Sequence, residues 1–294
     1  MPETTNQNLS AASETSLMAV YIRAMESQRP DALIKDEKAV ALVAQMRDEF
    51  ARFEQIPMSD AIKVMRNLAT REYDRQARDF LARHPDAGVV HIGCGLDSRF
   101  DRVDNSQVER YDLDLPEVIE LRRKLFGDEG KRHHLLGRSV LEEAWMDTLS
   151  ARHQHPFLFL AEGVFMYFEG AQVKSLVLTL RDRFQGAELV FDAYSPLHVW
   201  RHNLQTSTSK INMRVNWGIW HGQEIEKWDA ASPAGAGTLA PHEAQRSAGV
   251  RLLDEWGFFD NPTPRLAHIR WARPIEALAR TFRIYHFQLG KAAG

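Results

Sequence analysis

The first quarter of the chain carries apolar residues at helical spacing. Between residues 16 and 83 they recur every three or four positions, which predicts amphipathic helices. A first set consists of Leu17, Val20, Tyr21 and Ala24. A second consists of Ala39, Leu42, Val43, Met46 and Phe50. A third helix is expected from about Asp60 to Ala82, and it stops near Pro85.

From residue 88 onward the pattern changes to short apolar runs separated by helical segments. Five runs of strand length lie near 88–93, 107–112, 133–138, 156–162 and 187–193. The clearest helices between them are Leu115–Phe126 and Ala171–Phe184. Strands that alternate with helices predict an α/β fold, with a parallel sheet covered on both faces.

The part after Tyr194 is less regular. Residues 195–245 are rich in Trp, His, Asn and Ser and then in Ala and Gly. The segment is too long for a simple connection, so we expect a lid or binding loop after the fifth strand. Beyond it, the pattern predicts a helix at Val250–Trp256 and strands at Arg265–Ile269 and Thr281–Leu289.

These patterns predict a polar tail and one domain. Residues 1–14 lack an apolar core and are expected to be disordered. The domain, 15–294, comprises N-terminal helices (15–84), a cofactor-binding core (85–194), a lid insertion (195–245) and the C-terminal end of the sheet (246–294). No signal peptide and no apolar run of membrane-spanning length, about 20 residues, is present, so we expect a cytoplasmic protein without membrane contact.

Charge and cysteine content narrow the functional classes. The net charge of −3 gives no electrostatic reason to bind nucleic acid. The single cysteine, Cys94, excludes an intramolecular disulfide and fits a reducing compartment. Its position between two glycines favours packing over a nucleophilic role. The oligomeric state cannot be read from the sequence.

A glycine turn after the first strand indicates a nucleotide site. Val89–Ile92 runs into Gly93 and Gly95, but Ser98 stands where a pyrophosphate-binding motif has its third glycine. About twenty residues later the second strand ends in acids, a position suited to holding a ribose diol. A nucleoside cofactor without a pyrophosphate fits this arrangement, and S-adenosylmethionine is the common one.

Three segments that are distant in sequence fall at the carboxyl ends of predicted parallel strands. They are Gly93–Gly95, Asp112–Asp114 and Glu162. Ligands bind beyond these ends, where the strand order reverses. The sequence therefore predicts that all three segments meet at one site.

The same segments carry a family resemblance. Gly93–Arg99 (GCGLDSR), Asp112–Val118 (DLDLPEV) and Ala161–Tyr167 (AEGVFMY) resemble signature segments of the leucine carboxyl methyltransferase family. Together with Ala24–Asp36, they look most like its bacterial branch of polyketide and other small-molecule O-methyltransferases. The resemblance implies a class I methyltransferase fold with a mostly parallel seven-stranded sheet. It also implies transfer of a methyl group from S-adenosylmethionine to a small-molecule hydroxyl, enol or carboxylate, in secondary metabolism, with S-adenosylhomocysteine as product.

The resemblance assigns cofactor contacts to the three segments. Gly93 and Gly95 allow the backbone to approach the cofactor, and Asp114 holds the ribose. Asp114 could instead, or also, cap the helix that starts near Leu115. Asp112 could be a strand-end residue on the solvent side. Glu162 contacts the methionine amine or nearby backbone, and its alternative is a structural carboxylate bonded to a loop.

Two departures from the family pattern concern the adenine and the cofactor carboxylate. Where many relatives place an aspartate for the adenine amine, this chain has Ser139. Arg71 is the best match for the arginine that holds the carboxylate, with a register uncertain by two residues; a surface arginine is the alternative. The remaining implied contacts are Cys94, Leu115, Val140 and Gly163.

The acceptor side rests on polar residues near the strand ends. Candidates for catalysis are His198, as a general base, and Tyr167. Candidates for substrate binding are Tyr21, Tyr194, His202 and Trp217, where Trp217 could equally be lid packing. His198 and His202 have metal-binding spacing, but without a third ligand we expect no metal.

Other functions remain open at this point. The family also includes protein C-terminal carboxyl methyltransferases, which need an open peptide groove. A lyase or cyclase could use the same cofactor without methyl transfer, and a binding protein would show no turnover. A nicotinamide dehydrogenase is disfavoured by the missing third glycine.

Overall fold

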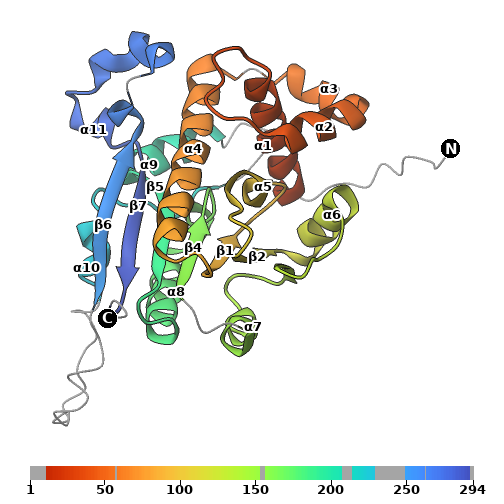
Figure 1. Ribbon diagram of the computed structural model, residues 1–294. Helices are drawn as coiled ribbons and strands as arrows, with labels where there is room; N and C mark the ends of the chain where they lie inside the picture. Colours follow the sequence, from red (N-terminus) through yellow and green to blue (C-terminus); the bar gives the residue numbers. More distant parts are fainter. Residues whose placement is uncertain are drawn as a thin grey trace.

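A seven-stranded sheet forms the centre of the computed structural model, which describes residues 11–56, 58–152, 156–206, 214–228, 249–261 and 263–291 (Figure 1). The strand order is β3-β2-β1-β4-β5-β7-β6. The strands are β1 (Gly88–Ile92), β2 (Glu109–Asp114), β3 (His133–Gly137), β4 (Phe157–Ala161), β5 (Glu188–Tyr194), β6 (Val250–Gly257) and β7 (Phe282–Leu289). The first five are parallel, and β7 is antiparallel to both β5 and β6.

Helices cover both faces of the sheet. They are α1 (Ala11–Ser27), α2 (Glu37–Gln45), α3 (Arg47–Glu54), α4 (Asp60–Arg83), α5 (Arg99–Val103), α6 (Pro116–Phe126), α7 (Ala144–Arg152), α8 (Gly170–Arg183), α9 (Pro196–Thr206), α10 (Gln223–Glu226) and α11 (Glu276–Ala279). The helices α4, α5 and α6 pack on one face, and α7 and α8 pack on the other. Every residue of β1 and β4 is buried, which explains why β4 is entirely apolar and why His91 is the only polar side chain in β1.

The N-terminal helices form a separate layer above the sheet. Apolar residues of α1, α2 and α3 pack together with Leu96, which follows the glycine turn, and with the end of α6. In Figure 1 these helices lie beyond α5 and α6, at the upper right of the sheet. The predicted helical region is therefore placed against the expected cofactor site.

Two predictions for the N-terminal region need correction. The second predicted helix is divided at Met46, where φ is −113° and ψ is 42°, into α2 and α3. The predicted disordered tail is too long, because α1 already begins at Ala11. Residues 1–10 lie outside the described residues.

Two predictions near the C-terminus are wrong in type. Val250–Trp256 is strand β6, not a helix, and its register shifts between Leu252 and Asp254. Two successive leucines, Leu252 and Leu253, stand at this shift and interrupt the alternation typical of a strand. The predicted strand at Arg265–Ile269 belongs to a 3-10 helix, η4 (Pro264–Ala272), which is held by Leu266 packing on α4.

The predicted lid is in part core structure. Its first residues form α9, and in segment 214–228 Trp217, Ile219 and Ile225 are buried against the sheet. Burial of these residues explains why the segment is rich in apolar and aromatic side chains. Residues 207–213 and 229–248 lie outside the described residues.

Candidate functional site

Strand register brings the three predicted segments together. Ile92 of β1 pairs with Leu113 of β2 and with Ala161 of β4. The next residue on each strand is therefore Gly93, Asp114 or Glu162, side by side at the carboxyl edge. The strand order reverses between β1 and β4, so this edge is the expected ligand position in a doubly wound sheet.

The glycine turn has a left-handed backbone conformation, which residues other than glycine rarely adopt. Gly93 and Gly95 have φ values of +64° and +50°. A Cβ atom at Gly93 would collide with Val164, and one at Gly95 would lie 2.7 Å from Ser16 Oγ of α1. The turn is thus closely covered by the loop after β4 and by the first helix.

The carboxylate of Asp114 accepts a hydrogen bond from this turn. Its Oδ2 accepts the Gly95 N–H at 2.7 Å, and its Oδ1 accepts the Leu115 N–H at 2.7 Å. The helix α6 is capped by Leu115, so the proposed N-cap role of Asp114 is wrong. Burial raises the pKa of Asp114, against the hydrogen bonds from Gly95 and Leu115. Each oxygen keeps a lone pair that could accept a ribose hydroxyl.

Asp112, in contrast, points into the fold. It is fully buried and pairs with Arg122 at 2.6 Å and with His133 at 2.7 Å. The suggestion that it lies on the solvent side is wrong, because α6 and β3 cover this position and supply Arg122 and His133 as partners. Asp112 ties α6 and β3 to β2.

Glu162 is held by two groups from other elements. Thr70 of α4 donates its hydroxyl to Oε1 at 2.9 Å, and Arg99 of α5 donates to Oε2. The side chain is 24% exposed. The carboxylate is thus fixed in place and still reaches the site.

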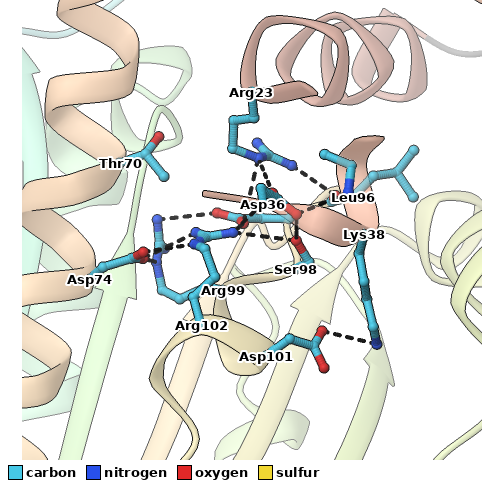
Figure 2. Close-up of polar contacts among 12 residues, drawn as sticks. Arg23, Asp36, Lys38, Thr70, Asp74, Leu96, Ser98, Arg99, Asp101 and Arg102 are labelled. Atoms are coloured by element: carbon cyan, nitrogen blue, oxygen red, sulfur yellow. Dashed lines mark hydrogen bonds and ion pairs between the residues drawn. The ribbon is translucent and has the colours of Figure 1, made fainter. Parts of the chain in front are cut away.

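Arg99 connects Glu162 to a buried network of charged side chains. Figure 2 shows Arg99 in this network with Arg23, Asp36, Asp74 and Arg102. Arg99 and Arg102 both bond to Asp74, and Arg102 also bonds to Asp36 at 3.0 Å. Arg23 of α1 joins the network through Asp36 at 2.9 Å. The network connects α1, the α1–α2 loop, α4 and α5.

Sequence reasoning missed a third carboxylate near the strand ends, besides those of Asp114 and Glu162. Asp192 of β5 is 1% exposed, and its Oδ1 accepts the Tyr73 hydroxyl at 2.8 Å and the Gly163 N–H at 2.6 Å. Burial raises its pKa to about 7, against those two hydrogen bonds. The sequence signal for Asp192 was an acid directly after the apolar run Leu189–Phe191 of β5. Gly163, a predicted cofactor contact, is fixed by this carboxylate.

Arg71, the predicted carboxylate-binding residue, lies on α4. It lines a cavity of about 530 Å³ with Asp36, Asp74, Arg78 and Arg102. Gly93, Gly95, Asp114 and Glu162 are not among the residues that line this cavity. The neighbouring Thr70 donates a hydrogen bond to Glu162. Thr70 contacts the strand-end site, whereas Arg71 lines the cavity.

The remaining predicted cofactor residues lie around the same edge. Cys94 is buried, and its thiol pKa is raised by burial, as expected for a packing role. Leu115 is 38% exposed at the start of α6. After β3, Ser139 Oγ accepts the Leu141 N–H at 3.3 Å. Val140 is buried, and its carbonyl accepts Trp145 Nε1.

Tyr194 and His198 form the clearest acceptor-side pair. Their rings stack at 4.4 Å, and His198 stacks on His202 at 6.2 Å. Burial raises the pKa of Tyr194 to about 12 and also raises that of Tyr167. Burial and the neighbouring His202 lower the pKa of His198. At neutral pH the phenols can therefore donate hydrogen bonds, and His198 is neutral.

Arg66 is a further residue that the sequence reasoning missed. It lies one turn before Thr70 on α4, and its positive charge acts on both Tyr167 and Tyr194. Its place on the same helix face as Thr70 could have been found by counting from that residue.

Two predicted substrate residues pack within apolar clusters. Tyr21 stacks on Phe50 and Phe53 in the N-terminal layer. Trp217 is 8% exposed and packs against Phe191 of β5 and Trp228. Its contacts are those of a core residue, so packing replaces the predicted pocket wall.

Two negative observations hold for the described part of the chain. No group of three potential metal ligands is found in it. None of its helices is both long and apolar enough to cross a membrane.

Comparisons with known proteins agree with the expected fold. A proposed methyltransferase from Thermobifida fusca superimposes with a TM-score of 0.55, at 14% identity, over 93% of this chain and 94% of that one. A duf574 family protein from Streptomyces avermitilis gives 0.50 at 13% identity, over 93% and 96%. The predicted class I methyltransferase fold is confirmed.

Proteins of similar sequence are also methyltransferases. The tetracenomycin polyketide synthesis O-methyltransferase TcmP of Streptomyces glaucescens is 30% identical over 271 residues, covering 91% of this chain and 89% of that protein. The S-adenosyl-L-methionine-dependent methyltransferase dpfgK of Gibberella zeae is 29% identical over 199 residues, covering 63% and 67%. The predicted cofactor agrees with the name of the second relative.

The family itself is identified by its sequence model. The leucine carboxyl methyltransferase model matches residues 16–181, which include all three signature segments. The chain therefore belongs to the leucine carboxyl methyltransferase family.

Proposed function

We propose that this methyltransferase transfers the methyl group of S-adenosylmethionine to an oxygen of a small-molecule acceptor. The observation that carries the proposal is the meeting of Asp114 and Glu162 beside the glycine turn. One carboxylate suits a ribose diol, and the other suits an ammonium group. The name of TcmP supports a small molecule of the polyketide class as acceptor.

The cofactor would be held by groups that the structure leaves able to bind it. Asp114 would take the ribose hydroxyls, Glu162 the ammonium, and Ser139 with Val140 the adenine edge. When bound, S-adenosylmethionine supplies a methyl group activated on a sulfonium sulfur. The protein then has to hold the acceptor oxygen in line with that methyl, and orientation alone contributes several kcal/mol.

Proton transfer on the acceptor side would involve His198 and the two phenols. A phenol or enol acceptor must lose a proton, whereas a carboxylate is already ionised at neutral pH. His198 is neutral and half-buried, so it can take that proton. Tyr167 and Tyr194 stay protonated and can orient the acceptor by donating hydrogen bonds.

Calorimetric titration with S-adenosylmethionine and S-adenosylhomocysteine tests the cofactor assignment. Wild type should bind both at micromolar concentration, and Glu162→Gln should bind them at least about tenfold more weakly. Glu120→Gln on the exposed face of α6 is a matched control that should bind like wild type. Absence of binding by folded wild type would refute the proposal.

A screen for acceptors follows binding. Aromatic phenols, enols and carboxylic acids are incubated with S-adenosylmethionine, and release of S-adenosylhomocysteine is measured. Turnover of one chemical class identifies the acceptor. Methylation of a peptide C-terminus, with no turnover of any small molecule, would instead assign the protein carboxyl methyltransferase role.

A further inference from the structure

Glu162 is held more rigidly than a strand-end carboxylate requires. Thr70 binds one oxygen at 2.9 Å and Arg99 binds the other. Thr70 is 4% exposed and Arg99 is 0% exposed, so water does not compete with Glu162 for their donor groups. Two lone pairs of the carboxylate remain for a ligand.

Arg99 is itself fixed on several sides. It pairs with Asp74 at 3.0 Å and with Asp97 at 3.1 Å, and its guanidinium lies 5.1 Å from the ring centre of Tyr73. Its Nη1 donates to His91 Nε2 at 3.0 Å. Burial and Arg99 lower the pKa of His91 to about 3, so this imidazole is neutral and accepts the hydrogen bond.

The network that ends at Glu162 carries an unbalanced charge. The ion pairs join three arginines to four carboxylates, namely Arg23, Arg99, Arg102, Asp36, Asp74, Asp97 and Glu162. One negative charge is in excess. Glu162 is the most exposed of the four acids, so a ligand would meet the excess charge there. Glu162 is 24% exposed and keeps free lone pairs, so a cationic group of a ligand can pair with it there.

We propose that Thr70 and Arg99 are positioning residues that preset Glu162 to receive the ammonium group of the amino-acid part of the cofactor. The inference rests on the proposed function, since it takes S-adenosylmethionine as the ligand. Fixing the carboxylate before binding removes the entropy cost of ordering it when the ligand arrives. The pair should therefore raise affinity for ligands that carry the ammonium and leave other nucleosides unaffected.

Two thioether nucleosides separate this role from general support of the site. S-adenosylhomocysteine carries the amino-acid group, and 5′-methylthioadenosine lacks it. Thr70→Val removes the hydroxyl at nearly constant volume and should weaken binding of the first about fivefold, with binding of the second unchanged. Thr70→Ser keeps the hydroxyl and should restore it. Thr148→Val on α7, which loses only a bond to its own helix, should change neither affinity.

Arg99→Lys tests the second positioning residue. It keeps the charge but loses the fork that reaches Glu162 and Asp74 together, so it should also lower the ratio of the two affinities. In a Glu162→Gln background Thr70→Val should have little further effect. If Arg99→Lys does not fold, the Thr70 series decides the question by itself.

The outcomes separate the two proposals. No binding of S-adenosylhomocysteine by wild type would refute the proposed function. Binding by wild type, with both nucleosides weakened equally by Thr70→Val or neither weakened, would overturn the positioning role and leave the function standing. Loss specific to S-adenosylhomocysteine, with rescue by Thr70→Ser, would support it.

Discussion

Two aspartates two residues apart on β2 have opposite tasks. Asp114 bonds the glycine turn with both oxygens, whereas Asp112 pairs with Arg122 and His133 inside the fold. The sequence DLD does not distinguish them, because residues two apart on a strand face the same side of the sheet. Their substitution should therefore separate binding from stability.

Asp114→Asn should lower affinity for S-adenosylhomocysteine at least about tenfold, because the charged acceptor is lost. It should cost only about 1 kcal/mol of stability, because the amide can accept just one of the two backbone N–H groups that Asp114 binds. Asp112→Asn should destabilise the protein by about 3 kcal/mol, because Arg122 would be left buried beside a neutral partner. Calorimetry and thermal unfolding measure the two effects. Equal loss of stability in both variants would contradict the assignment.

The pKa of Asp192, about 7, has a consequence for stability. A carboxyl group has an ordinary pKa of about 4 when unfolded, so between pH 4 and 7 the folded state holds the extra proton. Stability is then lost as the pH rises through this window, as expected for a group whose folded pKa is raised. The neighbours that face Asp192 are Tyr73 and Glu162.

Asp192→Asn removes this titration and keeps the shape of the protonated acid. From pH 5 to pH 8, wild type should lose roughly 2–3 kcal/mol of unfolding free energy relative to the variant. Urea unfolding at several pH values measures the difference. Parallel pH profiles for the two proteins would show that Asp192 does not titrate in this range.

His198 should matter for one class of acceptor. His198→Gln removes the neutral imidazole beside Tyr194 and should slow transfer to phenols or enols about 100-fold, within the usual range for a general base. Transfer to a carboxylate should change much less, since no proton has to leave. The ratio of the two rates is the measurement, and an unchanged ratio would exclude His198 as the base.

At the scale of elements, the turns after β1 and after β4 differ in the space around their glycines. Both Gly93 and Gly163 have positive φ, but a Cβ at Gly93 meets Val164 and one at Gly163 meets nothing within 4 Å. The first turn is constrained by packing as well as by backbone conformation.

Gly163→Ala should therefore cost about 1 kcal/mol of unfolding free energy, from backbone strain alone. Gly93→Ala should cost clearly more, because the strand ends must separate, and it should also weaken binding of S-adenosylhomocysteine. Chemical denaturation of both variants tests the order. A larger loss for Gly163→Ala would reverse it.

At the scale of the whole molecule, the N-terminal helices are tied to the cofactor edge by charge. Arg23 on α1 bonds Asp36 and donates to the Leu96 carbonyl just after the glycine turn. Elements separated by more than 70 residues thus share one buried network (Figure 2).

Arg23→Met should destabilise the protein by about 3 kcal/mol, because the buried Asp36 loses one of its two arginine partners. Arg29→Met removes an exposed pair with Asp31 and should change stability by less than about 1 kcal/mol. Thermal unfolding compares the two. A similar small effect for both would mean that the network does not hold α1 in place.

Sequence pattern alone determined the five parallel strands, the helices on both faces and the meeting of Gly93, Asp114 and Glu162. Local periodicity is sufficient for this, because the carboxyl ends of parallel strands lie at one edge of the sheet. Pattern failed at β6, where a register shift hides the alternation, and at Trp217, because composition does not distinguish a lid from a covering of the core.

The tertiary structure decided which polar residues act together. The contact of Thr70 and Arg99 with Glu162 spans 92 and 63 residues, and that of Tyr73 with Asp192 spans 119. No local pattern encodes such pairs, because they arise when α4 and α5 pack on the sheet. The sequence determined where the cofactor edge lies, and only the packing of helices against it determined which charges are buried, paired and left for a ligand.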